Sequence, residues 1–434
     1  MLNKLKLVFS NNSIVKKILI TFIILFVYKI GTYIPNPLID VESMQIYITN
    51  NSFLTILNTF SGGALGQFSV LALGISPYIT ASIVIQLLQS GIIPKFKEWG
   101  EQGEVGKQKL NKATRYLSVF LAFVQALLLI LGLGQNPVNI FKTGVDTTTV
   151  IPYIFSALMI TAGSAFVLWL SDLITRYGIG NGSSIMIVAG IVTSLPSMMT
   201  TLWTKYITGS TNGWSYLWFA VIIVLYIAVI VGVVFMESAK RKVPVQYANR
   251  QQGGKADSNI PIKLNTSGVI PVIFASTLLS IPLSIVGMTT SDTSSGIGYW
   301  FNLFFNYQEP IGMILYVILI YLFSFFYAFM TIDPEKMADN LQKSNAFIPG
   351  VRQGEETVGY ISKLLFKITL IGATYLTVLA LIPLIISKVF AFTQAEASVI
   401  TIGGTSLLII VGVAIETTKQ METAATETTY SGLY

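Results

Sequence analysis

The chain has 434 residues, of which 53% are hydrophobic and 11% are charged, against roughly 25% charged residues in ordinary soluble domains. It contains no cysteine and no histidine, which excludes disulfides, thiol nucleophiles, and the commonest metal ligand and general base. The composition therefore predicts an integral membrane protein that is not an enzyme and that uses no metal or cofactor.

Apolar runs of about 17–25 residues recur along the chain, and each is long enough for a helix across a hydrocarbon core of roughly 30 Å. Segment 1–17 carries four lysines, but no small-residue cleavage site follows, so we expect a retained first helix rather than a signal peptide. We predict an all-α fold with ten transmembrane helices. They lie near residues 18–34, 68–93, 117–134, 151–170, 183–202, 214–236, 268–288, 310–332, 364–386 and 398–415.

The 27 Lys and Arg residues are distributed unevenly between the two sides of these helices. The loops on one side hold only Lys142, Lys205 and Lys388, and most of the other basic residues lie in the alternate loops and the termini. Because Lys and Arg in short loops stay on the cytoplasmic side, we expect both termini and the long loops 237–267 and 331–363 to face the cytoplasm.

The stretch NTFSGGALGQFSV, at 58–70, differs from the segments on either side of it. It is too polar for a spanning helix and too apolar for a solvated loop. Irregular backbone is tolerated at membrane depth only where protein or a water-filled cavity surrounds it. We therefore expect a re-entrant half-helix that dips into the centre from outside, with an ordinary external loop containing a Gly-Gly turn as the alternative.

Two stretches of similar sequence, GISPYITAS at 74–82 and GVIPVIFAS at 268–276, fall in the second helix of each run of five. The fifth helices also match, with NGSSIMIVAG at 181–190 and GGTSLLIIVG at 403–412. Since five is an odd number, the second set of helices enters the membrane from the opposite side. The sequence therefore predicts an inverted-topology repeat, although chance similarity between apolar segments is the alternative.

Inverted repeats place their pathway at the interface between the halves, next to helices that Gly and Pro interrupt. Gly74 with Pro77 and Gly268 with Pro271 mark such helices here. We expect two halves of five helices around a central pore. The expected divisions are a cytoplasmic N-terminal segment at 1–17, a first half at 18–205, a second half at 206–416 and a cytoplasmic tail at 417–434.

The middle of the ten runs carries no Asp, Glu, Lys or Arg, and charged residues such as Lys29 lie toward the ends. Proton- and ion-coupled transporters usually need buried ionisable groups, so this absence argues against that class. Four isoleucines occupy matching positions in the repeats and could meet near the axis as an apolar constriction, which gates by dewetting. Plain core packing is the alternative for these residues, which are Ile79, Ile187, Ile273 and Ile409.

Several longer motifs are similar to those of a known family. They are FSGGAL, ALGISPYITASIVIQLL, RYGIGNGSSI, YANRQQG, KLNTSGVIPVIFAS and DNLQKSNAFIPGVRQGEET. With these motifs the chain resembles, from about residue 18 to 416, the bacterial SecY family of pore subunits of the Sec protein-conducting channel. The resemblance implies an hourglass-shaped pore that is closed by a ring of six apolar side chains and by an external plug.

Carried over position by position, the resemblance implies three groups of pore residues. The ring would consist of Ile75, Ile79, Ser183, Ile187, Ile273 and Ile409, of which Ser183 departs from the apolar pattern. The plug would span about 55–66 and include Asn58, Ser61, Gly62, Gly63 and Ala64. A lateral gate between the second and seventh helices would release signal sequences and membrane helices to lipid, at Gln86, Pro77, Pro271 and Thr277.

The resemblance also makes the cytoplasmic loops docking surfaces. Arg352, in the loop before the ninth helix, matches an arginine that the family needs for the motor ATPase SecA. An ordinary solvated loop is the alternative for the basic stretch in 237–267, which could otherwise contact ribosomal RNA phosphates. The basic residues in this stretch include Lys240, Arg241, Lys242 and Arg250.

The function implied by the resemblance is the central channel subunit of the Sec translocase, in the bacterial cytoplasmic membrane. It would conduct unfolded secretory proteins across the membrane and release membrane helices laterally into the lipid bilayer. The implied partners are SecE, SecG, SecA, the translating ribosome, signal sequences and nascent membrane proteins, with YidC as a further candidate. The alternatives are an accessory SecY paralogue for specialised substrates and a solute transporter with inverted repeats.

Overall fold

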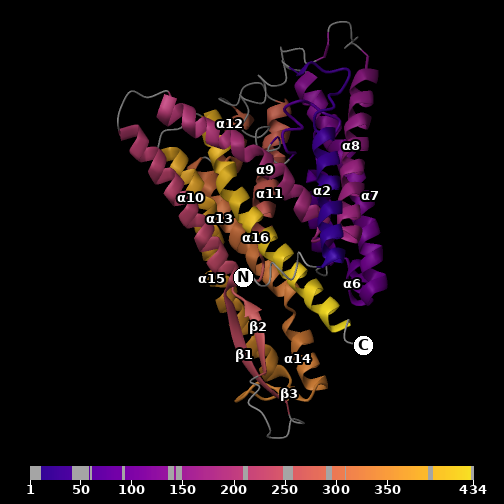
Figure 1. The fold of residues 1–434 in the computed structure, drawn as a ribbon, viewed down its shortest axis with the longest axis vertical. Helices are drawn as coiled ribbons and strands as arrows, with labels where there is room; N and C mark the ends of the chain where they lie inside the picture. The colour runs from indigo at the N-terminus through magenta and orange to yellow at the C-terminus, as the bar shows by residue number, and fades with distance from the viewer. Residues whose placement is uncertain are drawn as a thin grey trace.

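The fold was analysed in a computed structural model of the 434-residue chain. The residues that the structure describes are 11–41, 58, 61–89, 93–134, 141–142, 149–208, 214–247, 258–289, 296–307, 309–389 and 394–431. Each of the ten predicted apolar runs contains a helix within these residues. The prediction of an all-α membrane fold is therefore confirmed, with a small sheet added at one end (Figure 1).

The helices of the first half pack around α7 and α8, with α5 and α6 on α7, and α2 and α9 on α8. The last of them passes without interruption into a π-helical turn at Thr204–Thr208. These helices are α2 (Asn12–Gly31), α5 (Ser76–Leu87), α6 (Pro94–Glu101), α7 (Gly103–Gly134), α8 (Ile151–Tyr177) and α9 (Gly182–Trp203).

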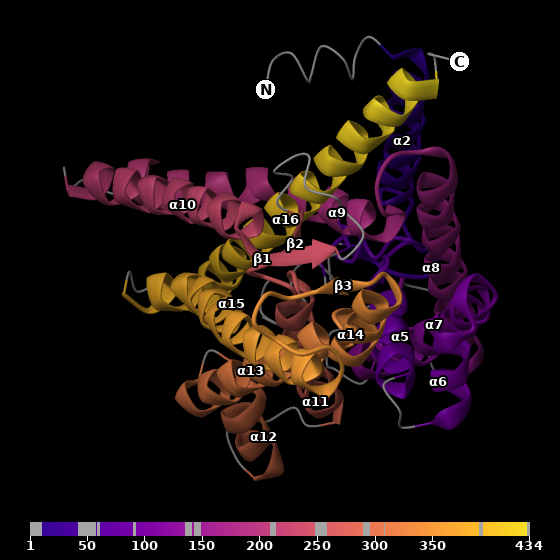
Figure 2. The ribbon, with the colours of Figure 1, turned by 90° about the horizontal axis from the view of Figure 1, so that it is seen from below.

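The helices of the second half pack mainly around α13 and α15, while α16 also packs against α9 of the first half. Seen from below, α16 crosses the molecule toward α2 (Figure 2). The helices are α10 (Trp214–Ser238), α11 (Ile270–Thr289), α12 (Ile297–Phe305), α13 (Pro310–Thr331), α14 (Pro334–Lys343), α15 (Glu355–Val389) and α16 (Gln394–Ser431).

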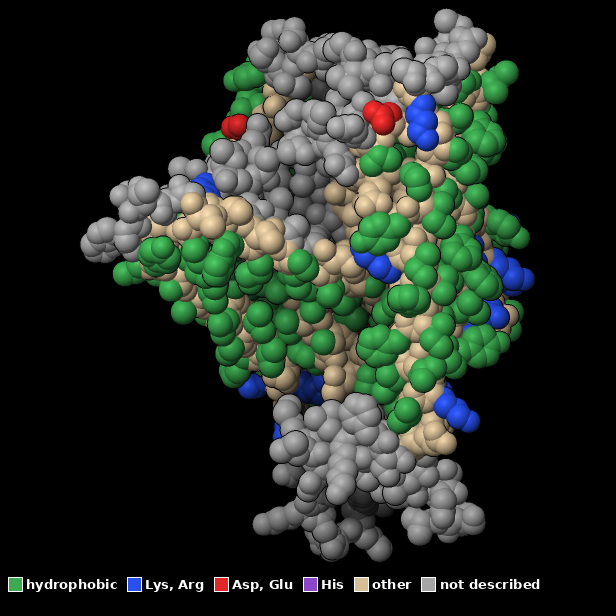
Figure 3. All heavy atoms as spheres, turned by 45° about the horizontal axis from the view of Figure 1, so that its top comes forward, with side chains coloured by type: hydrophobic (Ala, Val, Ile, Leu, Met, Phe, Trp, Pro, Cys, Tyr) green, Lys and Arg blue, Asp and Glu red, His purple; other side chains and the backbone are tan. Residues whose placement is uncertain are grey.

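Five helices among the described residues are long and apolar enough to cross a membrane by length and composition alone. Apolar side chains cover most of the middle of the face in Figure 3. Large apolar side chains such as Phe22, Trp169 and Phe235 are exposed, and their contact with water would be unfavourable. In a membrane they would contact lipid or partner helices instead. The spans are Gly103–Leu131, Ile151–Tyr177, Ser215–Ser238, Pro310–Lys343 and Glu355–Ile386, with shorter apolar helices at Ser76–Leu87, Gly182–Thr193 and Ile270–Leu279.

The two copies of the repeated stretch adopt the same local structure, at a helix start rather than in a helix interior. Gly74 and Gly268 have φ values of +52° and +64°, a region that favours glycine. In each copy the helix begins two residues later, so the proline lies in its first turn, where its missing N–H costs nothing. The expectation that Gly and Pro interrupt these two helices is therefore wrong, because they start them.

The fifth helices do not show this equivalence at their starts. The backbone of α9 begins at Gly182, just after the turn at Gly180, whose φ is +83°. Gly404, which matches Gly182 in the repeat, lies well inside α16, which begins at Gln394. The sequence match in this pair therefore does not mark the same helix boundary.

A three-stranded sheet projects from one end of the helices, in strand order β2-β1-β3 (Figure 1). Its inner face packs on α14 and α15 through a cluster that includes Val243, Ile262 and Ile361. The start of α2 packs on the C-terminal part of α16 through Ile14 and Met421, so these two ends of the chain lie together. The strands are β1 (Lys240–Tyr247), β2 (Ser258–Lys263) and β3 (Ala346–Phe347).

Candidate channel and docking surfaces

From Ser61 onward, the segment predicted as a plug is a chain of turns in the part that the structure describes. Residues 55–57 and 59–60 lie outside the described residues, and the backbone from Ser61 to Ile75 runs through consecutive turns. The predicted half-helix is therefore wrong for residues 61–70, whereas Asn58 is helical. The turns are closed locally, since the Gly63 N–H donates to the Asn58 carbonyl at 2.8 Å.

The same segment lies in the interior, against α9. Gly62 has a φ of +70°, and a Cβ added there would lie 3.1 Å from the Cα of Gly190 and 3.3 Å from Oγ1 of Thr193. A side chain at this position would therefore strain the backbone and crowd α9 at once. Ala64 is completely buried, so the segment fills a space between helices rather than lying on the surface.

Five of the six residues predicted as a ring belong to one central apolar cluster. Ile75, Ile187 and Ile409 are buried in it, with exposed fractions of 4%, 8% and 4%. The half-buried Ile79 and Ile273 pack against this cluster, to which Ala64 of the turn segment also belongs. Side chains from the α5 start, α9, α11 and α16 therefore meet at one apolar centre with the predicted plug.

Ser183 is not part of this apolar cluster. Its backbone N–H and its hydroxyl both donate to Oδ1 of Asn181, at 3.1 and 2.8 Å. This arrangement is typical of a polar cap at a helix start, here the start of α9. The hydroxyl of Ser183 is thus held by the cap, which explains how a polar residue is accommodated beside an apolar centre.

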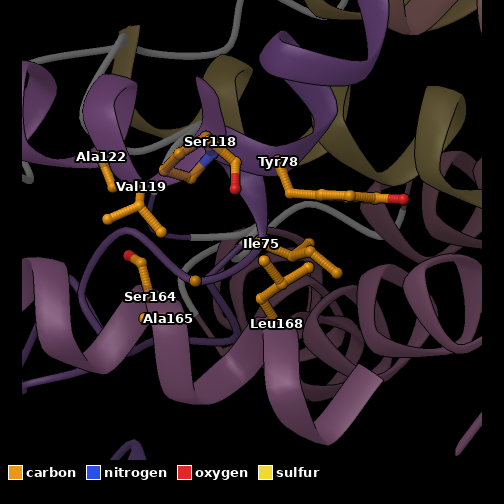
Figure 4. Close-up of a pocket in the computed structure, with 10 residues that line it drawn as sticks. Ile75, Tyr78, Ser118, Val119, Ala122, Ser164, Ala165 and Leu168 are labelled. Atoms are coloured by element: carbon orange, nitrogen blue, oxygen red, sulfur yellow. The ribbon is translucent and has the colours of Figure 1, made fainter. Parts of the chain in front are cut away.

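The start of α5 is wedged between α7 and α8, next to a small cavity (Figure 4). The cavity is about 10 Å³, which is room for about one water molecule. Pro77 and Tyr78 line it from α5, Ser118 from α7 and Ser164 from α8. The buried hydroxyl of Ser164 has no hydrogen-bond partner among the described residues, so an ordered water in this cavity would satisfy it.

The predicted lateral gate contains a polar contact that the sequence did not indicate. Gln86 of α5 donates through Nε2 to the Ser82 hydroxyl at 2.9 Å and accepts through Oε1 from the hydroxyl of Tyr327 on α13. Thr277 donates to the Ile273 carbonyl at 2.8 Å within its own helix. Across this surface Ile83 of α5 belongs to the cluster that contains the apolar side chains of α11 and α13.

The basic docking residues lie on the sheet. Lys240, Arg241 and Lys242 are exposed on β1, which pairs with β2 as an antiparallel hairpin. Arg250 lies outside the described residues. Because β3 pairs with β1, the two predicted docking loops form a single surface, a link that the sequence did not reveal.

Arg352 follows β3, and its backbone is fixed while its side chain is exposed. Its N–H lies 3.4 Å from a carboxylate oxygen of Glu356, and its carbonyl accepts from the Thr357 hydroxyl at 2.7 Å. Its guanidinium forms no ion pair with any residue that the structure describes. The arginine is therefore presented to solvent from a rigid turn.

A buried polar contact joins the base of the hairpin to α10. Nδ2 of Asn265 donates to Oε1 of Glu237 at 2.7 Å, and both residues are buried. Lys419 of α16 lies nearby, where burial lowers the pKa of its ammonium group and the like charges of Lys263 and Lys240 lower this pKa further. The hydrogen bond between Asn265 and Glu237 thus attaches the sheet to the end of α10, and charged side chains lie near this bond.

Apolar helices packed around an isoleucine-rich centre that includes a turn segment are the features of a multi-pass membrane protein. The sequence model of the SecY family matches residues 69–418. Protein translocase subunit SecY of Staphylococcus epidermidis is 42% identical over 98% of this chain and 97% of its own length. The subunit of the same name from Bacillus subtilis is 42% identical over 96% and 95%. The chain belongs to the SecY family.

Solved structures show the same fold at lower sequence identity. One described as "The structure of a protein conducting channel" aligns with a TM-score of 0.61 at 20% identity, over 94% of this chain and 92% of that chain. Another, "Sec61 in the Canine ribosome-channel complex from the endoplasmic reticulum", aligns with a TM-score of 0.58 at 20% identity, over the same shares of the two chains. The relatives' names describe a translocase subunit rather than an enzyme.

Proposed function

We propose that this chain is the central channel-forming subunit of a bacterial Sec translocase, conducting unfolded secretory proteins and releasing membrane helices laterally into lipid. The observation that carries the proposal is the apolar cluster in which isoleucines from the α5 start, α9, α11 and α16 meet Ala64. An apolar constriction excludes ions by dewetting and binds no particular solute. These properties suit a pathway for polypeptides of any sequence.

In this proposal the two halves, 18–205 and 206–416, are the walls of the pathway, and the membrane substrate leaves between α5 and α11. Both termini and the sheet lie in the cytoplasm, as the positive-inside pattern indicates. The packing of Ile14 on Met421 supports placing both ends on one side. Segment 55–66 acts as the plug, and the five clustered isoleucines act as the ring.

The exposed surfaces of the chain suggest where each proposed partner binds. SecA and the translating ribosome dock on the sheet, where Lys240, Arg241, Lys242 and Arg352 are exposed and can contact carboxylates or phosphates. SecE, SecG and YidC approach through the membrane, where apolar side chains of α2 and α10 are exposed. Signal sequences enter the lateral gate.

The test uses a natural property of the chain, its lack of cysteine. Single cysteines are placed at Ser82 of α5, at Ser276 of α11 and, as a control, at Val231, which is 63% exposed on α10. Each variant is reconstituted with a stalled preprotein that carries a thiol-reactive crosslinker. We expect crosslinks from both gate positions and none from Val231.

Absence of crosslinks at both gate positions, together with solute-dependent uptake by the purified protein, would contradict the proposal and favour a solute transporter. Crosslinks to a few substrates only would favour an accessory paralogue over the general translocase subunit.

A further inference from the structure

α2 carries a cation whose role the channel geometry does not by itself explain. Lys29 lies in the last turn of α2, after a run of mostly apolar residues, where a charged side chain needs a partner or access to water. It forms no ion pair with a described residue. Its ammonium group instead donates to the Gly62 carbonyl at 3.2 Å and lies 5.0 Å from the ring centroid of Tyr33.

The preceding residue makes a parallel contact. The hydroxyl of Tyr28, which is only 2% exposed, donates to the Ser61 carbonyl at 2.9 Å. Two consecutive residues of α2 therefore donate to two consecutive carbonyls of the turn segment. Within the turn itself the Ser61 carbonyl accepts a long bond from the Ala64 N–H, at 3.4 Å, so the donors from α2 add to the hydrogen bonds that keep these carbonyls inside the protein.

The turn segment is also confined from the opposite side. Gly62 packs so closely on α9 that a Cβ there would lie 3.1 Å from the Cα of Gly190. Tyr28 itself belongs to the central cluster that contains Ala64, Ile75 and Ile187. Any movement of the segment out of the apolar centre must therefore break both donor contacts from α2.

We propose that Tyr28 and Lys29 form a plug clamp, a pair of positioning residues on α2 that hold segment 61–64 in the constriction and set how readily it leaves. The inference rests on the proposed function, because it gives this segment the role of plug. The clamp acts on backbone carbonyls, so its strength depends on the donor groups of α2 and not on the side chains of the plug. The bond from Lys29 has a charged donor but is longer, at 3.2 Å, and the bond from Tyr28 is neutral but shorter and buried, so the two contributions are comparable.

The experiment compares Tyr28→Phe and Lys29→Met with two matched controls. Tyr33→Phe removes a hydroxyl from an exposed tyrosine of the same helix end, and Lys29→Arg keeps a charged donor. Ala64→Cys, in the cysteine-free chain, reports plug displacement through its rate of modification by a membrane-impermeant maleimide in resting proteoliposomes. Resting ion conductance in planar bilayers is the second measurement.

We expect Tyr28→Phe and Lys29→Met each to raise the labelling rate roughly 3- to 10-fold, as the loss of one hydrogen bond predicts, with conductance rising in parallel. Tyr33→Phe and Lys29→Arg should stay close to the parent protein. In a chain lacking residues 58–66, the two clamp substitutions should add nothing to the conductance.

The outcomes separate the clamp from the plug. If deleting 58–66 raises conductance but neither clamp substitution changes labelling, the clamp is overturned while the plug stands. If the clamp substitutions raise conductance further in the deletion background, they act elsewhere and the clamp is again overturned. If the deletion itself leaves resting conductance unchanged, the plug role fails and the clamp fails with it.

Discussion

The hydroxyl of Tyr327 offers a sharp test of the lateral gate. It donates to Oε1 of Gln86, and this contact joins α13 to α5 across the predicted opening. The ring of Tyr327 also packs edge-on against Phe274 of α11, with centroids 5.1 Å apart. Tyr327→Phe removes the hydroxyl and keeps the ring, so it isolates one polar contact of the closed gate.

The expected magnitude follows from the loss of one neutral hydrogen bond, about 0.5–1.5 kcal/mol. Gln86 keeps its bond to Ser82 at 2.9 Å, so no large additional penalty is expected. A bias of this size shifts the equilibrium between closed and open gate about 2- to 12-fold toward the open state. Translocation of a preprotein with a weakened signal sequence should rise by a similar factor.

The assay is protection of this preprotein from protease in proteoliposomes. The control is Tyr321→Phe on the same helix, whose hydroxyl lies 2.9 Å from Thr374 Oγ1 of α15 rather than near α5. A double-mutant cycle with Gln86→Leu measures the coupling between the two side chains. Unchanged translocation in Tyr327→Phe, or strict additivity in the cycle, would refute the reasoning.

Three other predictions concern the constriction, the docking arginine and the hairpin base. Ile187→Gly combined with Ile409→Gly removes two buried side chains from the central cluster, so the double variant should leak ions in planar bilayers. An unchanged resting conductance would contradict the role of these isoleucines as a sealing ring. Arg352→Glu should abolish SecA-driven translocation into inverted vesicles, while the free energy of unfolding changes by only about 0–1 kcal/mol. Normal translocation would show that this loop is an ordinary solvated loop. Asn265→Leu leaves the buried carboxylate of Glu237 without its donor and should lower the free energy of unfolding by about 1–3 kcal/mol. A melting temperature in detergent equal to that of the parent protein would contradict a stabilising role for the Asn265–Glu237 hydrogen bond.

The helices and the clustering of the isoleucines could be predicted from the residues alone, whereas the small sheet was not predicted. Hydropathy and length are local properties, so a window of about 20 apolar residues predicts a span whatever surrounds it. The repeated stretches also placed Gly74 and Gly268 correctly as special positions, although their role as helix starts was not foreseen. The Asn181 cap of α9 was not predicted, although asparagine favours that position.

Only the tertiary structure decided which polar groups meet. Lys29 was conspicuous in its apolar run, but its acceptor, the Gly62 carbonyl, is a backbone atom that any sequence would supply. Tyr327 and Gln86 are 241 residues apart, and their contact depends on how α13 and α5 are rotated and packed. Hydropathy determines which segments enter the membrane, whereas a hydrogen bond needs two atoms within about 3 Å, which only the packed helices set.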